Sequence, residues 1–340
     1  MSLDFLLLLI LVFLLSCCGT WGIRTLALRH SILDIPNQRS SHNVPVPKGG
    51  GLALLLSFYI GGGYLVLTDR IDIPHLLELG GCGLGIAIVG FLDDLFHLSA
   101  VIRIIVHLFC VFVAVRFFVP IDELFFNWGN ATPLILVQFL LVVGVVWLLN
   151  LYNFMDGIDG LAGAEVISAA LGAGIILLLK GEAENYLPLL QILVAASFGF
   201  LVWNWPPAKI FMGDACSGFL GFCFGIFALL TAPFTSLSLW TWIILLAAFI
   251  VDSTVTLAVR ILRGEKFYLA HRSHAYQILA RRAGSHLKVT LGYLGVNWLF
   301  LFPLACLSVY KPEYGLFLAI FSYALLTIFC IFAGAGMTND

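Results

Sequence analysis

LILVQFLLVVGVVWLL (residues 134–149) runs directly into NLYNFMDGIDG (residues 150–160). The first stretch has no charged residue and predicts an apolar helix at about residues 133–151, because about 20 apolar residues are needed to cross the hydrocarbon core of a bilayer. The second stretch places polar side chains at intervals of three residues, at the end of that helix. Together they predict a membrane-spanning helix with a chemical group at one end.

The composition extends this interpretation to the whole chain of 340 residues. Apolar residues make up 61% and charged residues 11%, and the mean hydropathy is +1.05. Soluble domains carry roughly 25% charged residues, so an ordinary soluble enzyme is excluded and lipid must cover much of the surface. The eight cysteines lie mostly in apolar runs without a Cys-x-x-Cys pair, which favours small buried side chains over disulfides or a zinc site.

Eleven segments are apolar enough to be membrane-spanning helices. We therefore predict an all-α, polytopic integral membrane protein in which residues 1–340 form a single membrane-embedded domain. The first segment contains Asp4 and no basic region, which favours an uncleaved span over a signal peptide. The third segment is short and rich in glycine, which suits close helix packing. The expected spans are about 3–23, 49–68, 76–92, 99–119, 133–151, 160–180, 187–204, 213–232, 237–261, 289–310 and 314–335.

The positions of Lys and Arg predict the orientation of these spans. Of 17 such residues, 13 lie on one side of the predicted bundle, and the other side has only Arg70, Arg116, Lys180 and Lys311. Cytoplasmic loops carry the excess of basic residues, so the N-terminus is expected to be periplasmic and the C-terminus cytoplasmic. The basic side also collects the acidic, amide and histidine side chains of the loops at about 24–48, 93–98, 150–160, 205–214 and 263–288. We therefore expect the chemistry to take place at the cytoplasmic face.

The strip after the fifth predicted span holds Asn150, Asn153, Asp156 and Asp159. Residues three apart lie along one face of a helix end, and their oxygens can coordinate a cation or bind a ribose and the edge of a base. Gly157 and Gly160 allow close approach of the backbone. The structural alternative is an Asx-rich turn with Asp159 as the N-cap of the next helix, which explains only one of these polar residues.

Further acidic residues stand at the ends of other spans. Asp93 and Asp94 follow the third span directly, and Asp214 opens the eighth. Adjacent carboxylates at a membrane edge are costly unless they are paired, hydrated or metal-bound, and their repulsion can raise one pKa so that the group serves as a base. The alternatives are a solvated helix end for the pair and an N-cap for Asp214. Phe211 could stack on a nucleobase or pack at the membrane edge.

Two basic loops accompany the acidic residues, and Arg103 places a further charge within a span, where ionisable groups are functional by default. The early loop ends in glycines whose N–H groups can bind an anion. In the late loop, arginine suits bidentate phosphate binding. The alternative is charge that sets topology and contacts anionic lipids, which explains the late histidines poorly. The residues concerned are Arg39, His42 and Lys48 in the early loop and His271, Arg272 and His274 in the late loop.

Five motifs, in their order along the chain, resemble those of the polyprenyl-phosphate N-acetylhexosamine-1-phosphate transferases. They are the loop Arg39–Gly51, the Asp93-Asp94 pair, the Asn150–Asp159 strip, Phe211-Met-Gly-Asp214 and the late histidine loop. The likeness covers about residues 1–335. This superfamily includes the bacterial muramyl-pentapeptide and GlcNAc-1-phosphate transferases. The resemblance implies transfer of a HexNAc-1-phosphate from a UDP-sugar to undecaprenyl phosphate, with release of UMP and with Mg²⁺ (alternatively Mn²⁺) as cofactor.

The same resemblance implies a role for each motif. The metal ligands would be Asp214 and Asn153, and the catalytic residues would be Asp93, Asp94 and Arg103. The nucleotide would contact Asn150, Asp156, Asp159 and Phe211. The phosphates and the sugar would contact Arg39, His42, Lys48, His271, Arg272 and His274.

The chain also departs from family patterns. The muramyl-peptide branch carries adjacent histidines in the late loop, whereas His271 and His274 are separated here, which argues against a peptide-bearing donor. The glutamine often found where His107 stands is missing. The chain looks most like the branch that starts O-antigen chains in the bacterial inner membrane, some of whose members use 6-deoxy-HexNAc donors. Expected partners are therefore a UDP-HexNAc, undecaprenyl phosphate and membrane lipid, with no nucleic acid; a homodimer is compatible with the resemblance.

Direct in-line attack of the lipid phosphate on the β-phosphate of the donor is the expected mechanism, and a covalent phospho-aspartate intermediate is the alternative. The alternative function is a membrane transporter or ion-coupled carrier, because intramembrane Asp and His residues can relay protons. Transporters usually show repeated halves and charges at the midplane, and neither is visible here. A phosphotransferase of CDP-activated lipids would carry a compact multi-aspartate motif, whereas these aspartates are spread from Asp93 to Asp214.

Overall fold

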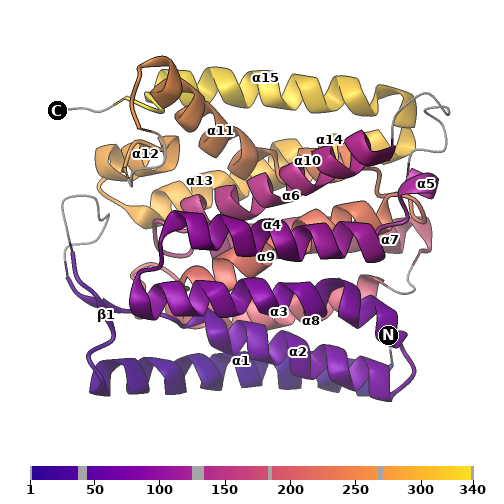
Figure 1. Ribbon diagram of the computed structural model, residues 1–340, viewed down its shortest axis with the longest axis horizontal. Coiled ribbons are helices and arrows are strands. Elements are labelled where there is room, and N and C mark those ends of the chain that lie inside the picture. Colours follow the sequence, from indigo (N-terminus) through magenta and orange to yellow (C-terminus); the bar gives the residue numbers. More distant parts are fainter. Residues whose placement is uncertain (1, 37–43, 125–133, 183–185, 267–270, 338–340) are drawn as a thin grey trace.

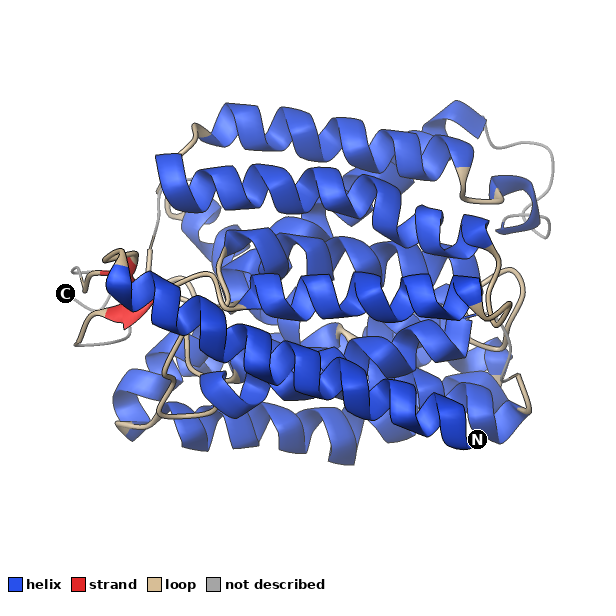
Figure 2. Ribbon diagram, turned by 90° about the horizontal axis from the view of Figure 1, so that it is seen from below, coloured by secondary structure: helices blue, strands red, loops and turns tan. Residues whose placement is uncertain are grey.

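The structure is a computed structural model that describes residues 2–36, 44–124, 134–182, 186–266 and 271–337. Its long helices run side by side, with the N-terminus at one end of the bundle and a small β-hairpin at the other (Figure 1; Figure 2). The hairpin pairs β1 (Leu33–Asp34) with β2 (Val46–Pro47) in antiparallel register. The helices are α1 (Leu3–Arg29), α2 (Gly51–Leu67), α3 (Ile73–Phe96), α4 (Ala100–Phe117), α5 (Ile121–Leu124), α6 (Leu134–Met155), α7 (Leu161–Lys180), α8 (Tyr186–Asn204), α9 (Asp214–Thr231), α10 (Leu239–Leu245), α11 (Ala247–Leu262), α12 (Ala275–Ala283), α13 (His286–Val296), the π-helix η2 (Asn297–Leu301), α14 (Phe302–Tyr310), the 3-10 helix η3 (Pro312–Tyr314) and α15 (Gly315–Ala333).

The predicted fold class is confirmed. In the described part of the chain, nine helical spans are long and apolar enough to cross a membrane, and the bent pair α10–α11 makes a tenth. The apolar helix α2 is shorter, with 17 residues. These elements follow the eleven predicted segments in order, so the protein is an all-α, multi-pass membrane protein.

The third predicted span, 76–92, was too short. Helix α3 has 24 residues and continues to Phe96, so Asp93 and Asp94 belong to its last turns instead of following it. His97, with φ of 52°, ends the helix in a left-handed conformation. The carboxylates are therefore held by a rigid helix and not by a loop.

Two further predicted segments differ in form from the expectation. The ninth predicted span, 237–261, is broken at Leu246, where α10 and α11 meet at an angle of 74°. Beyond the break, α11 packs against both α6 and α15. The late loop expected at 263–288 contains the helix α12, and α13 already begins at His286.

The interior of the bundle is formed by α7, α8 and α9, because 83%, 72% and 89% of their most apolar stretches are buried, compared with 22% for α1. Small residues permit this packing. A Cβ at Gly221 of α9 would lie 2.7 Å from the Leu149 backbone of α6, and one at Gly199 of α8 would clash with the Phe13 carbonyl of α1. Large apolar side chains such as Leu299 and Phe332 remain exposed on the outer helices, where lipid is their solvent.

Candidate active site

Three carboxylates meet where the last turns of α3 approach the first turn of α9. Asp94 accepts hydrogen bonds from the backbone N–H groups of Asp214 (3.2 Å) and Ala215 (3.4 Å), so it satisfies donors at the N-terminus of α9. The helices come this close because Gly90 has no side chain: a Cβ there would lie 2.5 Å from the Asp214 carbonyl oxygen. We call this part of the bundle the acidic end, defined by Asp93, Asp94 and Asp214.

Two cations neutralise these carboxylates. Lys48 lies 2.5 Å from Asp94 and 3.6 Å from Asp214. Arg103 lies 2.5 Å from Asp93 and 3.6 Å from Asp214. The side chains of Asp93 and Asp94 are each 9% exposed, whereas that of Asp214 is 29% exposed. Asp214 is therefore the carboxylate of this cluster that an entering ligand can reach most easily.

Backbone pairing places Lys48 in this position. Gly49 and Gly50 donate to the Phe211 carbonyl (3.1 and 2.9 Å), and Phe211 donates to the Pro47 carbonyl (2.8 Å). Burial lowers the pKa of Lys48, but the carboxylates of Asp214 and Asp94 outweigh it and the net shift is upward from the usual value. Lys48 therefore keeps its charge at neutral pH beside the acidic end. Arg39 and His42 of the same predicted loop lie outside the described residues.

The predicted strip lies partly against this cluster. Asn153 donates to the hydroxyl of Ser217 (2.9 Å), one turn along α9 from Asp214. Burial raises the pKa of Asp156, and the charge of Asp214 raises it further, while Lys48 opposes the shift. Asn153 thus contacts α9 beside the carboxylate cluster. Asn150 instead donates to the Val146 carbonyl in its own helix (2.7 Å).

Asp159 has a different environment. Its carboxylate accepts from the backbone N–H of Ala208 (3.0 Å) and lies 3.1 Å from His286 of α13. Its carbonyl accepts from the Thr290 hydroxyl (3.0 Å). Asp159 therefore joins three segments of the chain. The alternative interpretation of Asp159 as the N-cap of the next helix is wrong, because Gly160 occupies that position at the start of α7.

The late motif, which consists of His271, Arg272 and His274, lies beside the end of α6. The rings of His271 and His274 stack at 4.9 Å, and His274 lies 5.6 Å from the ring of Tyr276. Tyr276 donates to the Phe154 carbonyl (2.9 Å), which ties α12 to the Asn150–Asp159 strip. Burial lowers the pKa of His271 to about 3, with smaller contributions from the charges of His274 and Arg260, so His271 is neutral at pH 7. Arg272 is exposed.

Asp252 of α11 was missed by the sequence analysis, although it is an ionisable residue inside a predicted span. It is fully buried and accepts from the backbone N–H groups of Ala275 (2.8 Å) and Tyr276 (2.9 Å) at the start of α12. It also accepts from the hydroxyl of Tyr293 (2.5 Å) and lies 3.7 Å from Nδ1 of His274. Asp252 therefore holds the late motif in place from within the bundle.

The carboxylate cluster supplies oxygen ligands of the kind that bind a divalent cation together with a substrate phosphate. Among the described residues, no three Asp, Glu, His or Cys side chains form a group that could hold a metal ion. Mg²⁺ at phosphate-transfer sites is usually held by one or two carboxylates with waters and substrate phosphates. Lys48 Nζ already lies near both Asp94 and Asp214, so the space between these two carboxylates accommodates positive charge. The residues thus fit a cation completed by phosphate oxygens.

Comparison with known proteins identifies the family. The profile of glycosyl transferase family 4 matches residues 76–232, which run from α3 to α9 and include the three carboxylates, Arg103 and the Asn150–Asp159 strip. A probable undecaprenyl-phosphate N-acetylglucosaminyl 1-phosphate transferase of Bacillus subtilis is 30% identical, over 94% of this chain and 88% of its own length.

Two further relatives carry related names. An undecaprenyl-phosphate α-N-acetylglucosaminyl 1-phosphate transferase of Yersinia pestis is 28% identical over 80% of this chain and 76% of its own. A phospho-N-acetylmuramoyl-pentapeptide-transferase of Prochlorococcus marinus is 30% identical over 56% and 57%. Since the likeness to the Bacillus protein spans nearly the whole of both chains, this chain belongs to glycosyl transferase family 4, within the polyprenyl-phosphate N-acetylhexosamine-1-phosphate transferase superfamily.

Proposed function

We propose that this protein transfers a HexNAc-1-phosphate from a UDP-sugar to undecaprenyl phosphate, giving undecaprenyl-diphosphate-sugar and UMP. The observation that carries the proposal is the position of Asp214, partly exposed at the start of α9 between Lys48 and Arg103. Phosphoryl transfer requires positioning and charge neutralisation more than covalent chemistry from the protein. The names of the relatives support the same substrate classes.

The reaction is a single displacement in this proposal. An oxygen of the acceptor phosphate attacks the β-phosphorus of the donor, and the bond from that phosphorus to the oxygen bridging the α-phosphate breaks, so that UMP leaves with the bridging oxygen. Lys48 and Arg103 neutralise the diphosphate. Asp93 and Asp94 hold these two cations and orient the acceptor phosphate.

A divalent cation completes the proposed site. Asp214 and Asn153 would hold Mg²⁺ or Mn²⁺, which supplies charge neutralisation on the diphosphate when bound. Asp156, Asn150 and Phe211 are assigned to the uridine side of the site. Asp159 takes part through the loop that it joins to α13.

The late motif is assigned to the sugar and its phosphate. His271 is neutral at pH 7 and can act as a hydrogen-bond partner, whereas Arg272 is an exposed cation suited to phosphate. The separated histidines favour GlcNAc or a 6-deoxy-HexNAc over a peptide-bearing donor. The product would then start an O-antigen or related envelope glycan at the cytoplasmic face of the bacterial inner membrane.

The decisive assay uses purified full-length protein, undecaprenyl phosphate, Mg²⁺ and a panel of UDP-HexNAc donors, with release of UMP and of lipid-linked sugar as readouts. UMP release with one donor, dependent on both the acceptor and the metal ion, is the expected result. No turnover with any donor, together with transport of a labelled solute by proteoliposomes, would replace the proposal with the carrier function. Accumulation of a phosphorylated enzyme with donor alone would instead establish the two-step mechanism.

A further inference from the structure

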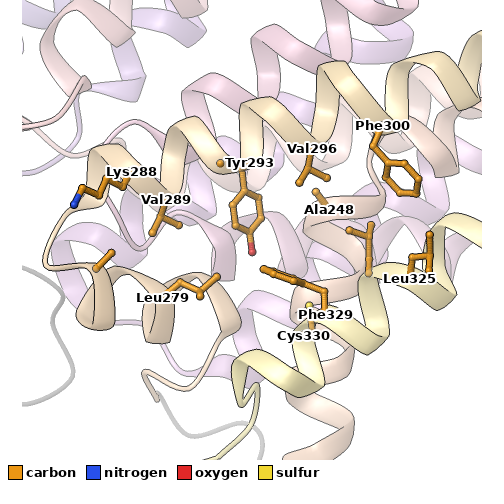
Figure 3. Close-up of a pocket in the computed structure, with 13 residues that line it drawn as sticks. Ala248, Leu279, Lys288, Val289, Tyr293, Val296, Phe300, Leu325, Phe329 and Cys330 are labelled. Carbon is orange, nitrogen blue, oxygen red and sulfur yellow. The ribbon is translucent and has the colours of Figure 1, made fainter.

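An apolar cavity lies between α11 and α15, and no residue of α6 lines it. It has a volume of about 550 Å³, is partly open, and is lined by residues of α11, α12, α13, η2 and α15. Figure 3 shows Lys288 at one end of the cavity and Phe300 at the other, with Leu325 and Phe329 of α15 on the opposite wall. The volume is typical of a binding site for a small ligand, about 300–1,000 Å³.

The cavity has the length of one leaflet of a bilayer. Lys288 and Phe300 are separated along a continuous helical segment, which at about 1.5 Å per residue corresponds to about 18 Å. Half of the hydrocarbon core is about 15 Å thick. Lys288 lies at the same end of the bundle as the carboxylate cluster. Helix α13 begins at His286, which contacts Asp159 of the Asn150–Asp159 strip, and Asn153 of that strip contacts Ser217 of α9. The cavity thus extends from the acidic end of the bundle toward the middle of the membrane.

Lys288 is the charged residue among those that line this apolar space. Lys288 is exposed, and none of the ion pairs between described residues involves it. The other lining residues are apolar or small, except Tyr293, whose hydroxyl is bonded to Asp252. An apolar slot one leaflet long with an unpaired cation at its mouth complements a lipid that has an aliphatic chain and a phosphate.

We propose that this cavity binds an anionic glycerophospholipid of the leaflet at the acidic end, with one acyl chain in the cavity and its phosphate against Lys288. The slot accommodates a chain of one leaflet's length, whereas an undecaprenyl tail is far longer. Helix α6, which borders the carboxylate cluster, contributes no residue to the lining of the cavity. The bound lipid is therefore distinct from the acceptor. The lipid packs on Tyr293, whose hydroxyl donates to Asp252. Asp252 in turn accepts from the start of α12 and so supports the late motif.

Two glycines of α13 offer a matched pair of test variants. A Cβ at Gly292 or at Gly295 would meet no atom within 4 Å, and only Gly292 lines the cavity. Gly292→Leu places a side chain in the cavity, whereas Gly295→Leu adds the same side chain three residues further along the same helix, at a position that does not line the cavity. Lys288→Gln removes the cation and Lys288→Arg keeps it.

Native mass spectrometry of the delipidated full-length protein measures binding of phosphatidylglycerol and phosphatidylcholine with identical acyl chains. We expect the wild type to prefer phosphatidylglycerol, and Lys288→Gln to weaken its binding about fivefold, with recovery in Lys288→Arg. Gly292→Leu should abolish the adduct that Gly295→Leu retains. Melting temperatures of all variants identify any loss of fold, and the substitutions at the exposed Lys288 test the proposal independently of the glycines.

Three outcomes would overturn the proposal. They are equal binding of the two lipids by the wild type, equal adducts in the two leucine variants, and displacement of phosphatidylglycerol by equimolar undecaprenyl phosphate, which would assign the cavity to the acceptor. The measurement contains no nucleotide sugar, so its outcome does not depend on the proposed transferase reaction.

Discussion

Asp214 is distinguished from Asp93 and Asp94 by exposure rather than by charge. Asp93 is paired with Arg103, and Asp94 is bound both to Lys48 and to the N-terminus of α9. Asp214 is 3.6 Å from each cation and is the most exposed of the cluster. At the residue scale, Asp93 and Asp94 therefore organise the cations, and Asp214 faces the ligand.

Asp214→Asn should reduce metal-dependent UMP release by at least about 100-fold, because it removes the negative charge that is proposed to hold the divalent cation at the diphosphate. Expression and melting temperature should stay close to the wild type, since the backbone N–H that Asp94 accepts from is kept. Asp122→Asn in α5 is the matched control, because Asp122 is exposed and belongs to a separate short helix. Full activity of Asp214→Asn would remove Asp214 from the metal site.

The raised pKa of Asp156 predicts that the stability of the folded protein decreases as pH rises. Burial and the charge of Asp214 raise its pKa in the folded state, so the folded protein loses stability as pH rises from the usual aspartate pKa toward the raised value. Asp156→Asn cannot ionise, and it should raise the melting temperature more at pH 8 than at pH 5. Equal gains in melting temperature at both pH values would show that the pKa of Asp156 is not raised in the folded state. Activity should fall in the same variant if Asp156 contacts the uridine.

Comparing substitutions at Arg272 and Arg282 distinguishes specific binding of the UDP-sugar from a general effect of positive charge. Both are exposed cations at the late motif and at the end of α12. Arg272→Ala should raise the KM for the UDP-sugar about tenfold or more, as loss of a charge-assisted hydrogen bond does, whereas Arg282→Ala should change it less than about twofold. Equal effects in steady-state kinetics would reduce the late motif to a generic basic surface.

At the element scale, the crossing of α3 and α9 depends on a single missing side chain. Gly90→Val should push the helices apart, because its Cβ would lie 2.5 Å from the Asp214 carbonyl oxygen. The contact of Asp94 with the start of α9 would then be lost, with a destabilisation of about 1–3 kcal/mol from overpacking and at least about a tenfold loss of UMP release.

Gly81→Val is the control for this crossing. It makes the same substitution in the same helix, where a Cβ meets no atom within 4 Å. Its melting temperature and turnover should stay near those of the wild type. Comparable losses in the two variants would mean that helix propensity, and not the crossing, determines the effect.

Helix α12 shows how much an element can depend on a distant residue. Its first N–H groups are bound by Asp252 of α11, and its Tyr276 reaches the Phe154 carbonyl of α6. Nothing in the local sequence of α12 specifies these partners. The late motif is therefore placed by contacts between helices that are adjacent only in the folded bundle.

At the scale of the whole molecule, the uneven distribution of basic residues predicts a periplasmic N-terminus and a cytoplasmic C-terminus. Tags fused to the two termini test this in spheroplasts. External protease should remove the N-terminal tag and leave the C-terminal tag intact until the membrane is permeabilised. The reverse pattern would place the acidic end outside the cell, away from nucleotide sugars.

The sequence by itself determined the class of the protein, the approximate limits of its spans and the residues at the acidic end. These follow from local properties, since apolar length predicts a span and a polar interruption marks its edge. Even so, the limit of α3 was missed, because Asp93 and Asp94 look like a loop when their partners Arg103 and Lys48 are unknown.

Only the tertiary structure decided which of these residues act together. Asp94 lies far from Asp214 along the chain, and their contact depends on how Gly90 lets α3 meet α9. The break at Leu246, the support of the late motif by Asp252 and the cavity beside Lys288 likewise arise from packing between helices. Hydropathy and residue spacing describe each segment alone, whereas these features are set by side chains that several helices contribute to one place.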